Sequence, residues 1–105
     1  MIPQDQPGPL RISIDPDLRD LIPGFLQNRR LDIQALQEAV VVGNFDTIRT
    51  VGHRMRGDGG GYGFHMISEI GHALETAALQ KNSQEITARV QELTTYLGRI
   101  EVVYE

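Results

Sequence analysis

The stretch FDTIRTVGHRMRG, residues 45–57, carries an apolar stripe and, away from it, a histidine flanked by arginines. Phe45, Ile48, Val51 and Met55 recur at steps of three and four residues, which is the spacing of one face of an α-helix. At roughly 100° per residue, His53 lies about 140° from Ile48 around the helix axis. We therefore predict a helix over residues 45–57 that presents His53 to solvent.

Helical spacing continues on both sides of this stretch. Before it, Asp15-Pro16-Asp17 combines an N-cap, a proline at the first helical position and an acidic first turn, so a helix is expected from Pro16 to about Val42. Pro23 should kink or break that helix, because proline lacks the N–H that the helix needs. Arg29 occupies a position on its apolar stripe and is expected to bury only the stem of its side chain.

After residue 57 the sequence predicts a glycine-dense loop at residues 58–61 and a helix over residues 64–81. Ser83 can cap a last helix whose apolar residues follow strict 4,3,4,3,4 spacing. These residues are Ile86, Val90, Leu93, Leu97, Ile100 and Tyr104. Such a seam needs helical partners.

Strand-like alternation is not expected to compete with these helices, and the connections between them are short. The predicted fold is all-α, an up-and-down antiparallel four-helix bundle with an additional N-terminal helical segment. Residues 1–14 contain three prolines and no sustained period, so a flexible N-terminal arm is expected there, extended near residues 10–14. Residues 15–105 form the predicted domain.

Length and composition limit the class of protein. A chain of 105 residues, 40% of them hydrophobic, suits one domain. The absence of cysteine excludes disulfides, thiolate catalysis and cysteine-based zinc sites. A net charge of −4 argues against nucleic acid as a partner. No apolar run approaches the length of a membrane span, so we expect a cytoplasmic protein without a membrane partner.

The flank around His53 has the chemistry of a phosphate acceptor. Arg49 and Arg56 lie one turn before and three residues after His53, within side-chain reach. Near pH 7 a histidine ring offers a lone pair that can attack phosphorus, and arginines can offset and hydrogen-bond the phosphoryl charge. Glycine is unfavourable inside a helix, so we interpret Gly52 and Gly57 as clearance for a docking partner. Gly57 could alternatively cap the helix.

The pattern resembles the histidine-containing phosphotransfer (HPt) domain of two-component phosphorelays. The matching residues are His53, Met55, Arg56, Gly57, Gly63, Ile67, Ile70, Gly71, Leu74 and Glu75, with Gly43, Asn44, Phe45, Ile48 and Gly52 upstream. Gly63, ten positions after the histidine, is interpreted as structural. Arg56 stands where lysine is commoner in the family, and Gly52 where alanine is.

The resemblance implies a phosphorelay intermediate without its own kinase. His53 would accept a phosphoryl group from a receiver-domain aspartate, or from a histidine kinase pathway, and pass it to a response-regulator aspartate. Arg56 would stabilise the phosphoryl charge, with Arg49 as an auxiliary charge. The domain would need no cofactor, because Mg²⁺ belongs to the partner receiver. Gly59-Gly60-Gly61 lacks the Lys-Ser/Thr of a P-loop and is interpreted as a close-packed turn. A monomer is expected.

Three other readings remain open at this point. His65, Glu69 and His72 share one helix face and could bind a metal ion, although a solvated surface is the plainer interpretation. The chain could be a helical adaptor in which His53 has no role. It could also be the phospho-accepting domain of a chemotaxis-type kinase, which would require a separate kinase chain.

Overall fold

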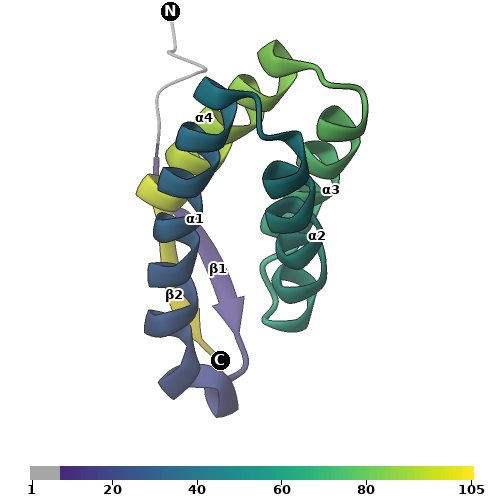
Figure 1. Cartoon of the computed structure of the whole chain (residues 1–105). Helices are drawn as coiled ribbons and strands as arrows, with labels where there is room; N and C mark the ends of the chain where they lie inside the picture. Colours follow the sequence, from purple (N-terminus) through teal and green to yellow (C-terminus); the bar gives the residue numbers. More distant parts are fainter. Residues whose placement is uncertain (1–7) are drawn as a thin grey trace, which may run out of the picture.

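The computed structural model describes residues 8–105, which fold into four α-helices, one 3-10 helix and two short strands (Figure 1). In chain order these are β1 (Leu10–Ile14), η1 (Pro16–Leu21), α1 (Ile22–Val42), α2 (Phe45–Gly61), α3 (His65–Leu79), α4 (Ser83–Arg99) and β2 (Ile100–Tyr104). The all-α helical bundle predicted from the sequence is confirmed, and η1 is its additional N-terminal helical segment.

The four helices form two pairs. In Figure 1, α1 and α4 lie on one side of the molecule and α2 and α3 on the other. The contact between α2 and α3 is the most extensive of any two helices. Short connections join successive helices, so each runs back along its predecessor as expected for an up-and-down bundle.

The first helical segment begins and breaks where the sequence predicts. The Asp15 side chain accepts a hydrogen bond from Asp17 N–H at 2.9 Å and caps η1. The 3-10 helix then gives way to α1 at Ile22, and Pro23 occupies the first turn of α1, where its missing N–H costs nothing. The predicted break with restart is confirmed.

The predicted glycine loop at residues 58–61 is wrong, because α2 continues to Gly61. The helix continues through these glycines, although glycine has a low helix propensity, because of how α2 packs on α3. A Cβ on Gly59 would lie 2.5 Å from Ser68 N and 2.9 Å from Phe64 O, so only glycine lets the end of α2 meet the start of α3. The chain turns instead at residues 62–64, where Gly63 has a φ of 90°, a conformation that favours glycine.

The expectation that no strands would form is also wrong. Leu10–Ile14 and Ile100–Tyr104 pair as a parallel two-stranded sheet. Residues 100–104 therefore leave the helix that was predicted to reach Tyr104, since α4 ends at Arg99 and Ile100 is extended. The extended conformation expected near residues 10–14 is confirmed, but these residues are part of the sheet and not of a free arm. The rest of the predicted arm lies largely outside the described residues.

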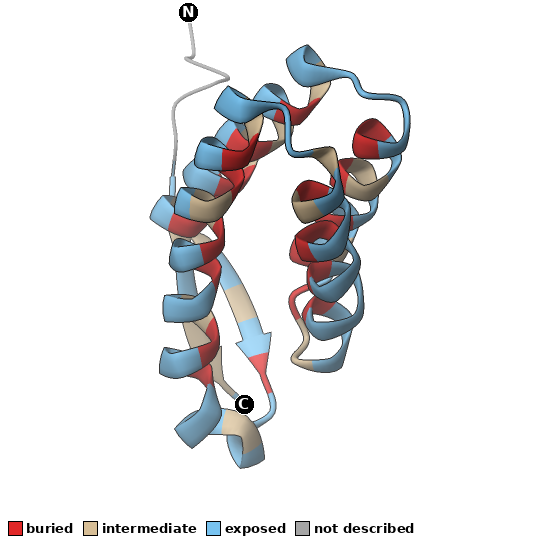
Figure 2. Cartoon of the chain, in the orientation of Figure 1, coloured by how far each residue is buried: buried red, intermediate tan, exposed pale blue. Residues whose placement is uncertain are grey.

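The buried residues lie on the faces of the helices that are turned toward the other pair (Figure 2), and they form one hydrophobic core cluster. Phe25 of α1 connects the pairs, because its ring lies 4.6 Å from that of Tyr62 and 5.3 Å from that of Phe64, centroid to centroid. Phe64, in the turn between α2 and α3, is fully buried. These aromatic contacts fix α1 against the end of α2.

Arg29 is buried together with a carboxylate, and not only by its stem as predicted. Its guanidinium Nε lies 2.9 Å from Asp32 Oδ2, and both residues are more than nine-tenths buried. Arg54 and Asp58 of α2 approach this pair at 3.8 Å each. Burial raises the pKa of Asp32, while the Arg29 and Arg54 charges oppose that rise. This charge cluster joins α1 to α2.

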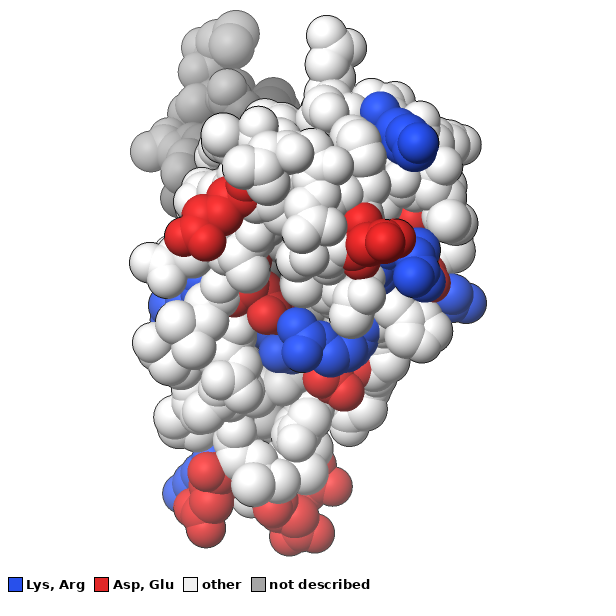
Figure 3. Space-filling view, in the orientation of Figure 1, with Lys and Arg blue, Asp and Glu red and all other residues white. Residues whose placement is uncertain are grey.

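Charges of both signs are interspersed over the face seen in Figure 3, with acidic side chains gathered at its lower end. The view shows no extended basic patch on this face. Among residues 8–105, no helix combines the length and the apolar character needed to cross a membrane.

We predict that Asp32→Ala lowers the free energy of unfolding by about 3–5 kcal/mol, because it leaves the buried Arg29 charge without its partner. The matched control is Asp58→Ala. The Asp58 side chain is 53% exposed and lies 3.8 Å from Arg29, so its loss should cost less than about 1 kcal/mol. Urea denaturation measures both, and equal losses would contradict the assignment of Asp32 as the principal partner.

Candidate functional site

Two glycines bring the backbones of α2 and α3 into direct contact beside His53. A Cβ on Gly71 would lie 2.5 Å from Arg56 N and 2.6 Å from Gly52 O. A Cβ on Gly52 would lie 2.8 Å from Gly71 O and 2.9 Å from Glu75 N. Real Cβ atoms do not approach backbone this closely, so any side chain at either position would push the helices apart.

The interpretation of Gly52 as clearance for a docking partner is therefore wrong. Gly52 is buried and faces α3, so packing accounts for it. Gly57 is different, because it is exposed and a Cβ there would meet nothing within 4 Å. It also lies inside α2 and does not cap it. Nothing in the packing of the described residues requires a glycine at position 57.

The close approach of the helices places a carboxylate against the histidine. His53 Nδ1 of α2 lies 3.0 Å from Glu75 Oε2 of α3. The His53 side chain is 69% exposed, as its place away from the apolar stripe predicts, whereas that of Glu75 is only 17% exposed. Glu75 thus holds one nitrogen of a ring that otherwise faces solvent.

Arg56 completes a small charged cluster. Its Nη1 donates to Glu75 Oε1 at 3.3 Å, so each carboxylate oxygen of Glu75 has its own partner. The hydrogen bond to His53 lowers the pKa of Glu75, and the bond to Arg56 lowers it further, against an opposing effect of desolvation. Glu75 is therefore ionised throughout the neutral range and accepts from both neighbours.

This geometry assigns the histidine tautomer. An ionised carboxylate only accepts hydrogen bonds, so Nδ1 of a neutral His53 must carry the proton. The lone pair of the ring is then on Nε2, the nitrogen that has no partner among the described residues. A neutral, oriented imidazole with its free nitrogen toward solvent is suited to nucleophilic attack.

Arg49 is exposed on the flank of α2, but within residues 8–105 it forms no hydrogen bond or ion pair with His53 or Glu75. The neighbouring Arg54 is directed toward Asp32 of α1 instead. Ser68 of α3 donates to Arg56 O at 2.5 Å and adds a second tie between the helices next to the site. Of the predicted residues, His53 and Arg56 are thus brought together and Arg49 is not.

The metal site considered from the sequence does not form. His65, Glu69 and His72 are exposed on α3, and no group of three histidine or carboxylate side chains in residues 8–105 is placed to hold a metal ion. Helical spacing put the three on one face but did not bring their ligand atoms together. The plainer interpretation as a solvated surface fits their exposure.

Glu75 is the site residue that reasoning from the sequence missed as a functional group. It was noted only as part of a family pattern, 22 residues after His53. Its position next to Leu74, which is fully buried, was the available signal, because a carboxylate beside a core residue lies at the edge of a helix interface.

A family model for the Hpt domain matches residues 20–102. The chain belongs to the Hpt domain family. A search of curated proteins and a search of solved structures found no match to it. Hpt domains are phosphotransfer modules of two-component signalling that interact with receiver domains, and they are carriers rather than kinases. The match spans all four helices, including the His53 flank of α2.

We predict opposite effects of alanine at two glycines of this Hpt domain. Gly71→Ala should lower the free energy of unfolding by about 1–3 kcal/mol, because its Cβ would collide with the α2 backbone. Gly57→Ala, in open space inside α2, should raise it by about 0.5–1 kcal/mol. Both follow from urea denaturation. A neutral Gly71→Ala would show that the helices do not need this close approach.

A second prediction concerns the carboxylate. In the wild-type protein the pKa of Glu75, followed by its side-chain carbon shift in an NMR titration, should lie below the ordinary value for glutamate. His53→Ala removes the largest cause of that shift, so the pKa of Glu75 should rise. Arg49→Ala is the matched control and should leave the pKa of Glu75 unchanged, since Arg49 forms no hydrogen bond or ion pair with Glu75. An unchanged pKa in His53→Ala would exclude the hydrogen bond.

Proposed function

We propose that His53 is the phospho-acceptor of this Hpt domain and that it carries the phosphoryl group between receiver domains. The observation that supports this most is the hydrogen bond between His53 Nδ1 and Glu75 Oε2, which leaves Nε2 free on an exposed ring. A structural histidine would have its ring buried or both nitrogens engaged. In this exposed ring, Nδ1 is hydrogen-bonded to Glu75 and Nε2 has no partner among the described residues.

In the proposed reaction the Nε2 lone pair attacks the phosphorus of a receiver's aspartyl phosphate. The new N–P bond forms as the bond from phosphorus to the aspartate oxygen breaks, and the aspartate leaves as a carboxylate. The Nδ1 proton stays on the ring, hydrogen-bonded to Glu75, so the positive charge that develops on the imidazole is stabilised by an adjacent anion. Transfer to a response regulator is the reverse of these steps.

The charges around His53 suit this exchange. Glu75 favours the imidazolium character of the phosphorylated ring, but its negative charge would repel the phosphoryl oxygens. Arg56 is bonded to the same carboxylate and half-exposed, so it can offset that repulsion and reach the oxygens as well. The receiver would supply Mg²⁺. Gly57, exposed and without a side chain, would leave room for the receiver close to the imidazole.

The proposal extends to the setting of the protein. We propose that the domain acts as a cytoplasmic monomer, because transfer in both directions needs the His53 flank of α2 free for successive receivers. Each complex should be short-lived, and the receiver and the cognate kinase would be selected by side chains around that flank.

The test is to incubate the protein with phosphorylated receiver domains and to follow label that is labile to acid and stable to alkali. Wild type should take up one label per chain, and His53→Gln none. Labelling of His53→Gln at the wild-type rate would refute the proposal, as would the failure of every donor that can be paired with the protein to label wild type.

Two arginine variants sharpen the same assay. Arg56→Ala should slow transfer by about tenfold, the equivalent of one charge-assisted hydrogen bond in the transition state, while the fold is retained. Arg49→Ala removes a charge on the same flank of α2, but this arginine forms no hydrogen bond or ion pair with Glu75. This variant should slow transfer by less than about threefold. Equal rates in the two variants would contradict the role of Arg56.

A further inference from the structure

The contact between α2 and α3 places a second histidine beside His53. A Cβ on Gly52 would lie 2.8 Å from Gly71 O, and a Cβ on Gly71 would lie 2.6 Å from Gly52 O, so the two glycines face each other. His53 follows the first glycine and His72 follows the second. Because the helices run antiparallel, an approximate two-fold axis normal to the pair relates these positions. Both histidines therefore lie on the same face of the pair, at nearly the same level along the helix axes.

The neighbours of His72 on α3 agree with this placement. Ser68, one turn before it, donates to Arg56 O, and Glu75, three residues after it, accepts from Arg56 Nη1. Residues at these spacings share one face of a helix. His72 thus lies between two side chains that both reach Arg56, and it is itself exposed.

The bonded groups around His53 carry no net charge to set against a phosphoryl group. Glu75 is ionised and accepts from both His53, whose neutral ring donates, and Arg56, which is positive. The charges of Glu75 and Arg56 therefore cancel. A phosphoryl group adds about −1.5 to −2 charges near pH 7. A further cation close to His53 would stabilise the phosphorylated form.

Two side chains of the α2–α3 pair can supply that charge, Arg49 and His72. Neither forms a hydrogen bond or ion pair in the described part of the chain, whereas Arg54 lies toward Asp32 of α1. Arginine keeps its charge at every pH at which proteins fold, but histidine changes its charge between about pH 5 and 8. His72 alone of the two can make the stability of the phosphohistidine depend on pH.

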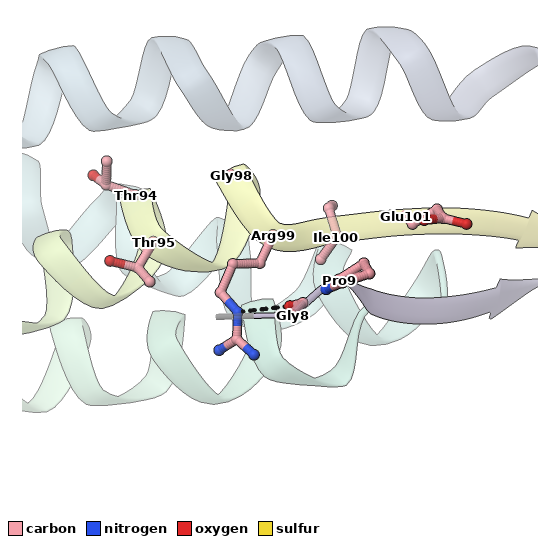
Figure 4. Close-up of a pocket in the computed structure, with 8 residues that line it drawn as sticks. All are labelled: Gly8, Pro9, Thr94, Thr95, Gly98, Arg99, Ile100 and Glu101. Carbon is pink, nitrogen blue, oxygen red and sulfur yellow. Dashed lines mark hydrogen bonds between the residues drawn. The ribbon is translucent and has the colours of Figure 1, made fainter. Parts of the chain in front are cut away.

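The arginines of α4 lie elsewhere. Arg99 lines a hollow of about 640 Å³ at the end of α4 and the start of β2, and its Nε donates to the Gly8 carbonyl at 3.2 Å (Figure 4). Arg89 is bonded to two glutamates of its own helix, at 2.9 and 2.7 Å. It shares a hollow with Met66 of α3, which is roughly 120° around that helix from His72. Neither arginine therefore faces the two histidines.

We propose that His72 is a second titratable group of the phosphotransfer site, an inference that rests on His53 being the phospho-acceptor. When protonated, His72 supplies a positive charge beside the phosphoryl group on His53 and stabilises the phosphohistidine. This step takes one proton from solvent and forms no bond to phosphorus. As the pH falls from about 8 to 6, the phosphoryl group should therefore shift from the receiver's aspartate toward His53.

Charged groups of both helices face His72 and bear on this effect. On α3, Glu69 and Glu75 lie three residues before and after it, and both attract an imidazolium. On α2, Arg56 repels an imidazolium, but its own charge is offset by Glu75 at 3.3 Å. The phosphoryl group on His53 adds the largest negative charge on this face, and that charge is present only in the phosphorylated protein.

The first measurement needs no receiver domain. Phosphoramidate, a small phosphoryl donor, loads Nε2 of His53 and releases ammonia, and the ring Cε1–H signals of the histidines are followed by NMR as the pH is changed. The titration midpoint of His72 should move upward by about 0.5 pH unit on loading, since the opposite charges attract across a screened surface. His65, exposed on α3 two turns earlier, is the matched control and should not move.

The outcomes separate the two proposals. If His53 takes up no phosphoryl group, the proposed function fails and the inference about His72 fails with it. If His53 is loaded but the midpoint of His72 stays in place, or moves no more than that of His65, the inference alone is overturned.

The second measurement is the distribution of label between the protein and a receiver domain at equilibrium. At about pH 6, His72→Gln should hold two- to threefold less label on His53 than wild type, and at about pH 8 the two should agree. His53, the phosphoryl group and the receiver also titrate, but they are common to both proteins. His65→Gln should match wild type. Equal distributions for wild type and His72→Gln at the lower pH would overturn the proposal.

Discussion

The direct backbone contact between α2 and α3 is the constraint on which the site depends. Gly52 and Gly71 each lie so close to the facing backbone that no Cβ fits, and Gly59 repeats the contact at the end of α2. Because Gly52 precedes His53 and faces the amide of Glu75, the same approach that joins the helices brings the carboxylate to the imidazole. The same backbone contact therefore determines both the packing of the two helices and the position of Glu75 beside His53. A wider spacing would leave His53 exposed but without the partner that selects its tautomer.

The remaining elements hold that pair of helices in place. Phe25 and the Arg29–Asp32 pair connect α1 to α2, the first through aromatic rings and the second through buried charge. The sheet joins the two ends of the described chain, with Arg19 over the Tyr104 ring as a further link between η1 and β2. None of these contacts touches His53. They leave its flank of α2 free on the surface while fixing the orientation of the helix that carries it.

The sequence predicts the helices well because apolar spacing reports which face is buried, and His53 could be placed at the surface on that basis alone. It fails where a contact distant in the chain overrides local preference. Gly59 packs against the start of α3 where no side chain fits, and α2 continues through it to Gly61. Ile100–Tyr104 leave the helical spacing because β1, some 90 residues earlier in the chain, offers a strand partner. Gly52 was misread for the same reason. Glu75 and Asp32 were missed because the spacing of charged residues along the sequence does not indicate which residue each of them pairs with in the fold.

The central claim is that Glu75 holds Nδ1 of His53 so that Nε2 is the nucleophile. The most direct measurement is a long-range ¹H–¹⁵N NMR spectrum of the protein with ¹⁵N-labelled histidine, recorded after phosphorylation by a receiver domain. The account predicts a phosphorus coupling to Nε2 of His53 and a protonated Nδ1. A phosphoryl group on Nδ1, or on His65 or His72, would contradict it.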